Sequence, residues 1–147
     1  MINPEPLLKG LADAKRNADR FNMKNWCLSN GKSIYFHERV IKAAEADCNS
    51  VLCIAGWASF YIPVNEKENV FVHDAVVSYC CGGNLNSKAA SDLYNVICGS
   101  NAIYPLEIMV QDITLQMVEE SIHEWIVDNC GREYLNQTLK KLSRSEQ

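Results

Sequence analysis

The sequence predicts a mainly α-helical protein, a compact single-domain helical bundle with a small β-hairpin near the N-terminal third. Three observations lead to this prediction. Apolar residues recur every three or four positions over several segments, which is typical of amphipathic helices. Glycine, proline and helix-capping residues separate these segments. One Asn-Gly pair lies between two runs rich in aromatic and β-branched residues, which favours a hairpin turn.

The size and composition fit one ordinary globular domain. The chain has 147 residues, of which 48% are hydrophobic and 22% are charged, and a chain of this length buries roughly two thirds of its unfolded surface in one core. No internal repeat or linker is visible in the sequence. We therefore expect a single domain over residues 1–147, with frayed ends at residues 1–5 and 143–147.

Charge and cysteine content argue against several classes of protein. A net charge of −4 disfavours a general binder of nucleic acid or anionic membranes, because such binders need a basic surface. No apolar run approaches the ~20 residues that span a bilayer, and residues 1–6 lack the layout of a signal peptide. Seven cysteines without a secretion signal indicate reduced thiols. We expect a cytoplasmic protein without a cofactor.

The first third of the chain is expected to hold a helix, the hairpin and a second helix. Apolar spacing from Leu7 to Phe21 predicts an amphipathic first helix after two prolines. Asn30-Gly31 is the expected hairpin turn. Residues 32–37 form its second strand or, because they also fit a helical stripe, a helix. A helix from Glu38 to Ala46 is expected in either case.

The central element of the bundle is expected to be a helix from Ser50 to Ile62. Asn49 or Ser50 can cap its first N–H groups, and Pro63 ends it because proline has no amide hydrogen. Almost every position is apolar or small, which indicates a helix surrounded by other helices. Gly56 is costly inside a helix, by roughly 1 kcal/mol relative to alanine. We therefore expect it to let another backbone come close.

Two further helices follow a polar loop. Residues 70–81 are apolar almost throughout and favour a helix, although residues 70–76 stay open between helix and strand. Residues 102–111 contain a proline and predict an irregular connection. The first helix is expected to begin near His73 and to end at Gly82-Gly83. The second is expected to begin at Asn86 or Ser87 and to end at Gly99.

The clearest amphipathic helix begins at Asp112 or Thr114 and ends at Gly131. Its apolar face runs from Leu115 to Ile126 and is either core or interface. Acidic residues lie on the opposite face: Glu119, Glu120, Glu124 and Asp128. A final helix turns three leucines inward: Leu135, Leu139 and Leu142.

Two stretches resemble a group of small bacteriophage and prophage proteins. That group has Phe-Asp-Met, a tryptophan, and then Cys-Gly-Thr-x-x-Cys-x-Ala-Gly-Trp-Ala. The chain has Phe21-Asn22-Met23, Trp26, and then Cys48 to Ala58 with Asn49-Ser50 in place of Gly-Thr. Residues 113–120 resemble the start of the helix that closes those proteins. The resemblance covers about half of the chain and implies a phage or mobile-element origin, without implying an activity.

Cys48 and Cys53 have a structural and a chemical interpretation. With Asn49 as the N-cap they occupy the N′ and N4 positions, whose side chains pack as a hydrophobic staple. Alternatively, the helix dipole stabilises a Cys48 thiolate and His73 is its base, which would make the protein a thiol-dependent hydrolase or transferase. No histidine stands in the sequence context that such folds require, so we rank the staple first.

A structural zinc site is a third alternative, and it would make the protein a small zinc-stabilised binding module. Zinc sites normally show two closely spaced pairs of cysteine or histidine. The chain offers one such pair, so we rank this alternative last. Its candidate ligands are Cys48, Cys53, His73 and Cys80.

The absence of catalytic motifs, the small size and the acidic charge favour a protein that binds another protein. We expect a non-enzymatic phage or mobile-element accessory protein that binds a host protein, for example a host-defence component. A basic partner would suit the acidic face, and a partly exposed tryptophan is a common interface anchor. The expected contact residues are Trp26, Glu119, Glu120, Glu124 and Asp128.

Overall fold

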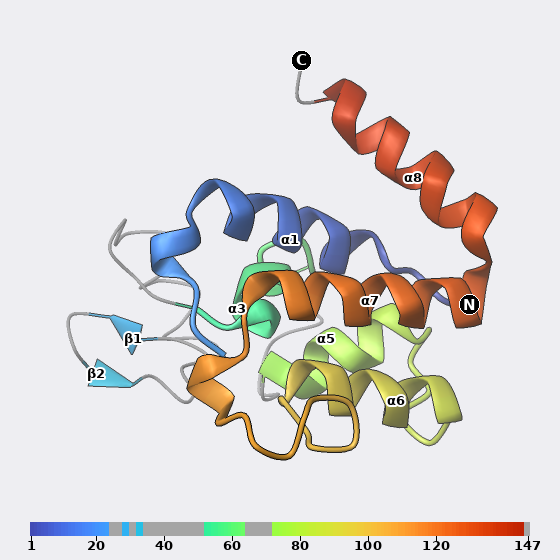
Figure 1. Ribbon diagram of the computed structural model, residues 1–147. Coiled ribbons are helices and arrows are strands. Elements are labelled where there is room, and N and C mark those ends of the chain that lie inside the picture. Colours follow the sequence, from blue (N-terminus) through green and yellow to red (C-terminus); the bar gives the residue numbers. More distant parts are fainter. Residues whose placement is uncertain (24–27, 30–31, 34–51, 64–71, 146–147) are drawn as a thin grey trace.

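The computed structural model describes residues 1–23, 28–29, 32–33, 52–63 and 72–145, and it is mainly helical (Figure 1). This confirms the predicted helical class. The predicted helix over residues 38–46 lies outside the described residues. The elements are α1 (Glu5–Arg16), η1 (Ala18–Arg20), β1 (Leu28–Ser29), β2 (Lys32–Ser33), α3 (Ile54–Ser59), α5 (Val72–Cys80), α6 (Lys88–Ile97), η2 (Val110–Asp112), α7 (Leu115–Cys130) and α8 (Arg132–Ser145).

The strands β1 and β2 pair in antiparallel fashion, with Leu28 opposite Ser33. Each strand has two residues, which is too short to support the predicted β-hairpin. Most of the residues that were expected to form the hairpin, including 34–37, lie outside the described ranges.

The first helix is shorter than its apolar stripe suggests. α1 ends at Arg16, and a short 3₁₀ turn, η1, follows. Phe21 has extended backbone angles (φ −111°, ψ 129°) and forms a parallel bridge with Leu52. The prediction that the helix continues to Phe21 is therefore wrong, because this residue pairs with a distant segment.

The predicted central helix is also too long. α3 has six residues, and its N-cap is Cys53, which has extended backbone angles (φ −77°, ψ 177°). Leu52 cannot join the helix because its backbone is used elsewhere. Its N–H donates to the carbonyl of Arg20 (2.9 Å), and its carbonyl accepts from the N–H of Asn22 (3.1 Å). A helix that starts at Ser50 is thus excluded.

α3 nevertheless lies at the centre of the core. All six of its residues are buried, and it packs against α1 and α5. The tight backbone approach occurs at Gly10 of α1, where an added Cβ would lie 2.7 Å from the backbone N of Ala58. We expected a close approach of this kind at Gly56, on the other helix of the pair.

The helix boundaries in the second half follow local signals. Ser87 caps α6, since its Oγ accepts from the N–H of Ala90 (3.1 Å). Thr114 caps α7 in the same way, accepting from the N–H of Met117 (3.2 Å). Gly131 ends α7 with a φ of 93°. Residues 72–76, which were open between helix and strand, are helical.

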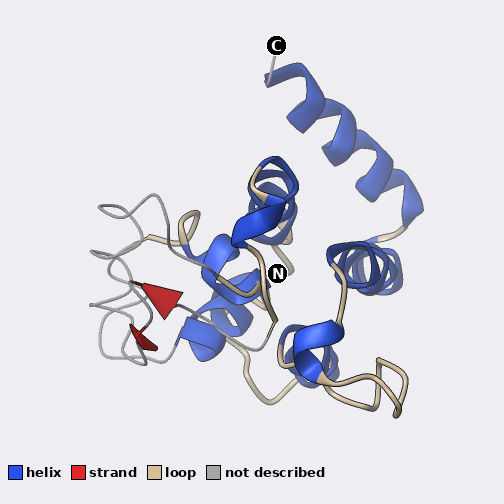
Figure 2. Ribbon diagram, turned by 60° about the vertical axis from the view of Figure 1, so that its left-hand side comes forward, coloured by secondary structure: helices blue, strands red, loops and turns tan. Residues whose placement is uncertain are grey.

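The helix α7 packs against its neighbours in the chain and also against the distant α1. α7 contacts α1, α6 and α8, and its apolar face is core, because Val118, Ile122 and Ile126 are fully buried. Figures 1 and 2 show α8 extending away from the other helices, with the C-terminus at its outer end. None of the described helices has the length and apolar character needed to cross a lipid bilayer.

Candidate functional site

The connection between α6 and α7 exposes large apolar side chains. Ile103, Leu106 and Met109 are 42%, 77% and 61% exposed. In the described part of the chain, eight large hydrophobic residues are exposed, and three of them lie within the seven residues from 103 to 109. We call Ile103, Leu106 and Met109 the apolar loop. A concentration of exposed apolar side chains in one loop is typical of a contact surface for another molecule.

Hydrogen bonds and a buried anchor hold this loop in place. Tyr104 is 4% exposed, and its hydroxyl donates to the carbonyl of Val96 in the last turn of α6 (2.9 Å). Burial raises the pKa of Tyr104 to about 12, so the hydroxyl keeps its proton. The carbonyl of Ser100 accepts from the N–H groups of Ile103 and Tyr104, both at 3.0 Å. The loop is therefore ordered before any partner arrives, which lowers the entropy cost of binding.

A half-open hollow of about 340 Å³ lies between α6, the apolar loop and α7. We call it the acidic hollow. Trp125 and Val96 contribute to its apolar surface, together with Ile103 of the loop. Carboxylates stand around it: Asp92 of α6, and Glu124 and Asp128 of α7.

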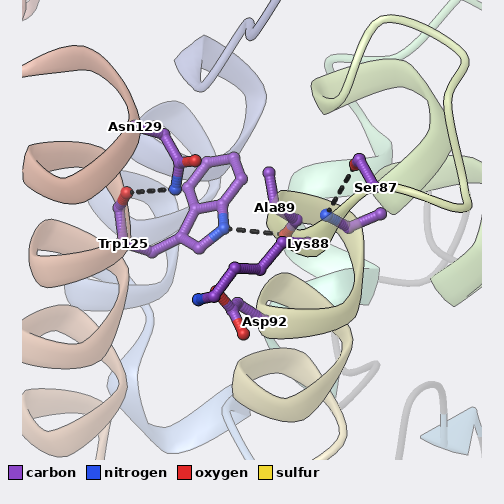
Figure 3. A network of polar contacts seen from close by, with 7 residues as sticks. Ser87, Lys88, Ala89, Asp92, Trp125 and Asn129 are labelled. Atoms are coloured by element: carbon purple, nitrogen blue, oxygen red, sulfur yellow. Dashed lines mark hydrogen bonds and ion pairs between the residues drawn. The ribbon is translucent and has the colours of Figure 1, made fainter.

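The wall of the acidic hollow is fixed by a polar network between α6 and α7 (Figure 3). The indole N–H of Trp125 donates to the carbonyl of Ala89 (2.9 Å), and the amide of Asn129 donates to the carbonyl of Trp125 (2.8 Å). Lys88 donates to Asp92 (2.8 Å), and this hydrogen bond raises the pKa of Lys88. The network holds the indole at the hollow. Glu124 and Asp128 of α7 are exposed beside it, and the charge of Asp128 also contributes to the raised pKa of Lys88.

Three of the four predicted acidic contact residues share one exposed line. Glu120, Glu124 and Asp128 are exposed and follow one another at one-turn spacing. Glu119 does not belong to this line, because it turns toward α1 and forms an ion pair with Lys15 (2.7 Å). The predicted contact residue Trp26 lies outside the described residues.

The structure brings one cysteine and one histidine together. The Sγ of Cys53 lies 3.9 Å from the Nε2 of His73. Cys53 is completely buried, and burial raises the pKa of its thiol to about 12, which the nearby N–H groups of Gly56 and Ala55 offset only in part. Burial also lowers the pKa of His73. This pair therefore rests as a neutral thiol beside a neutral imidazole.

The structure bears on the staple and zinc interpretations of Cys48 only through their other residues. Cys48 itself lies outside the described residues. The staple interpretation is wrong in its placement of Cys53, because this residue is the N-cap of α3 and does not occupy N4. Of the candidate zinc ligands, Cys53 and His73 are in contact and Cys80 is buried on α5. Among the residues that the structure describes, no three His, Cys, Asp or Glu side chains form a group that could hold a metal ion.

Sequence reasoning missed the apolar loop and its anchor, Tyr104. One signal could have found them: residues 103–110 contain six apolar residues without a helical or strand period. Apolar residues in an irregular connection either bury against the core, as Tyr104 does, or stay exposed, as Leu106 does. The chain matches no protein-family model, and it has no match among curated proteins or solved structures.

Proposed function

We propose that the protein is a non-enzymatic accessory protein of phage or mobile-element origin that binds a host protein in the host cytoplasm. A host-defence component is one partner of this kind. The binding surface is the apolar loop together with the adjoining acidic hollow. The single observation that carries the proposal is the ordered exposure of Ile103, Leu106 and Met109.

Among the residues that the structure describes, none covers the outer side chains of this loop. A loop that needed only to connect α6 and α7 could carry polar residues at its outermost positions, since Leu106 and Met109 leave most of their surface in water. Burying such side chains against a partner releases roughly 25 cal/mol for each Å² of apolar surface. Tyr104 and Ser100 keep the backbone in one conformation, so little of this gain is lost to ordering.

The chemistry of the surface indicates the chemistry of the partner. Apolar side chains would cover the loop, and basic side chains would meet Glu124 and Asp128 at the hollow. Opposite charges around an apolar contact mainly raise the association rate and select the partner. A basic and partly apolar segment of the host protein therefore fits best.

The experiment is a pull-down from host lysate with the immobilised full chain. The test variant is Leu106→Ser combined with Met109→Ser, and the matched control is Leu85→Ser, because Leu85 is 43% exposed elsewhere on the surface. We expect the wild type and the control to retain the same host protein and the double variant to lose it. Retention of the same proteins by all three chains would refute the proposal.

A thiol-dependent hydrolase or transferase is the second candidate. The 3.9 Å contact between Cys53 and His73 favours it, since a nucleophilic thiol needs a base within reach. In this version Cys53 takes the role first considered for Cys48. Complete burial of Cys53 opposes it, because a substrate must reach the sulfur. A folded Cys53→Ala variant that still binds the host protein but no longer has the effect of the wild type on the host cell would favour the enzymatic function.

A further inference from the structure

α8 is attached to the other helices by a small part of its surface. Gly131 is the single residue between α7 and α8. Within residues 132–144 of α8, only Leu135 and Thr138 are buried. Figures 1 and 2 show α8 extending away from the other helices, and its outer half is held to them by the ion pair of Lys141 with Glu5 of α1 (3.2 Å) and by Leu142, which packs against the core. Most of α8 is therefore open to another molecule.

The accessible side of α8 is basic. The helix carries four basic residues and one acidic residue in a chain whose net charge is −4. Lys140 and Arg144 lie one turn apart, on the side opposite the buried Leu135 and Thr138. Neither Lys140 nor Arg144 forms an ion pair with another residue in the described ranges. Their charges are available for a second molecule.

The acidic hollow has the complementary charge. Glu120, Glu124 and Asp128 follow one another at four-residue spacing on α7. Like charges at this spacing destabilise a helix. Glu124 and Asp128 form no ion pair with any other described residue. A basic helix laid along this row would relieve the repulsion.

The arrangement of the helices lets the basic α8 of each copy contact the acidic hollow of the other copy. α7 contacts α6 and α8, and Figure 2 shows α8 and the loop between α6 and α7 at opposite ends of the same side of the molecule. A two-fold axis near the exposed side of α7 would place each α8 across the acidic hollow of the other copy. We propose that the protein forms a symmetric homodimer in this way. Such an interface is closed, because each copy supplies one helix and one hollow.

The self-association rests on the proposed function in one respect, namely that the acidic hollow is a binding surface. It does not depend on Leu106 and Met109, which are the residues that test binding of the host protein. A dimer whose α8 lies in the hollow would compete with a basic segment of the partner. Partner binding would then be coupled to dissociation of the dimer.

The experiment is sedimentation equilibrium of the purified full chain at about 50 mM and about 500 mM salt. Two charge-reversed variants are compared with the wild type: the helix variant Lys140→Glu with Arg144→Glu, and the hollow variant Glu124→Lys with Asp128→Lys. Asp19→Lys is the control, because Asp19 is exposed on η1. Circular dichroism verifies that every variant is folded.

We expect the wild type and the control to dimerise at low salt and to dissociate at high salt, with a change in the dissociation constant of about tenfold or more. Each charge-reversed variant should be monomeric. An equimolar mixture of the two should form heterodimers, because both of its contacts again join opposite charges. The Leu106→Ser, Met109→Ser variant should dimerise normally even if it loses the host protein.

Three results would overturn the proposal. The first is a wild type that stays monomeric at both salt concentrations. The second is a dimer that neither charge reversal weakens. The third is a mixture of the two reversed variants that contains no heterodimer, although each variant is folded. None of these results bears on the pull-down with the apolar loop, so the two proposals fail separately.

Discussion

Replacement of Gly10 by alanine tests the closest helix contact in the core. An added Cβ would lie 2.7 Å from the backbone N of Ala58, 2.8 Å from its Cα and 2.9 Å from the carbonyl carbon of Trp57. All three are backbone atoms, so no side chain can rotate away, and α1 and α3 must move apart. Such overpacking typically costs about 1–3 kcal/mol, while alanine in place of glycine gains roughly 1 kcal/mol of helix propensity.

The backbone nature of the contact places the steric cost in the upper half of that range, so we expect a net loss of about 1–2 kcal/mol. For a chain of this size the melting temperature should fall by about 2–8 °C. Urea denaturation followed by circular dichroism measures the loss, with the control Asp19→Ala on the exposed turn η1 staying within about 0.5 kcal/mol of wild type. A Gly10→Ala variant as stable as wild type would refute the backbone contact.

Three further predictions concern Tyr104, the cysteines and His73. Tyr104→Phe removes the donor to the carbonyl of Val96 and should lower the free energy of unfolding by about 1–2 kcal/mol; an unchanged urea midpoint would contradict this role. Among the five cysteines that the structure describes, alkylation near neutral pH should modify the exposed Cys98 first, and Cys53 only after unfolding, because burial raises the pKa of Cys53 to about 12. Rapid native labelling of Cys53 would instead support the thiol enzyme. Burial lowers the pKa of His73 from 6.5, so the unfolded chain binds the proton more readily than the folded chain. The contribution of His73 to the free energy of unfolding should be complete above about pH 6.5 and fall as the pH decreases below it. Urea midpoints measured against pH should show a smaller slope for His73→Gln than for wild type, and equal slopes would contradict the burial of His73.

Local chemistry made part of the fold predictable. Ser87 and Thr114 cap their helices with their own side-chain oxygens, so the residue type at the boundary is itself the signal. Gly131 likewise ends α7 at a positive φ that glycine tolerates. In these three cases, the determining interaction lies within a few residues. The apolar stripe of α7 left open whether its face is core or interface, and the structure shows that it is core.

The errors have a common physical cause, which is a partner distant in the sequence. Leu52 looks helical by composition, but its backbone binds Arg20 and Asn22. Glu119 looks like its neighbour Glu120, but Lys15 of α1 pairs with it. A local sequence pattern does not predict which residue from a distant part of the chain will contact a given position.

The candidate site was predicted in part. The periodicity of α7 placed Glu120, Glu124 and Asp128 on an exposed face, and they are exposed. The hollow beside them depends on how α6 and the following loop pack against α7, which periodicity cannot show. The exposure of Leu106 and Met109 was missed because an irregular segment gives no rule for which side chains turn inward.

The parallel bridge between Phe21 and Leu52 fixes two positions that are far apart in the chain at neighbouring points of the folded core. Adjacent strands lie about 5 Å apart, so any stretch inserted between these residues leaves and re-enters the core at almost the same place. Doubling the length of such an insertion changes the closure free energy by only about 0.6 kcal/mol. A change in the length of the chain between these two anchors therefore does not by itself require α1 and α3 to pack differently against each other.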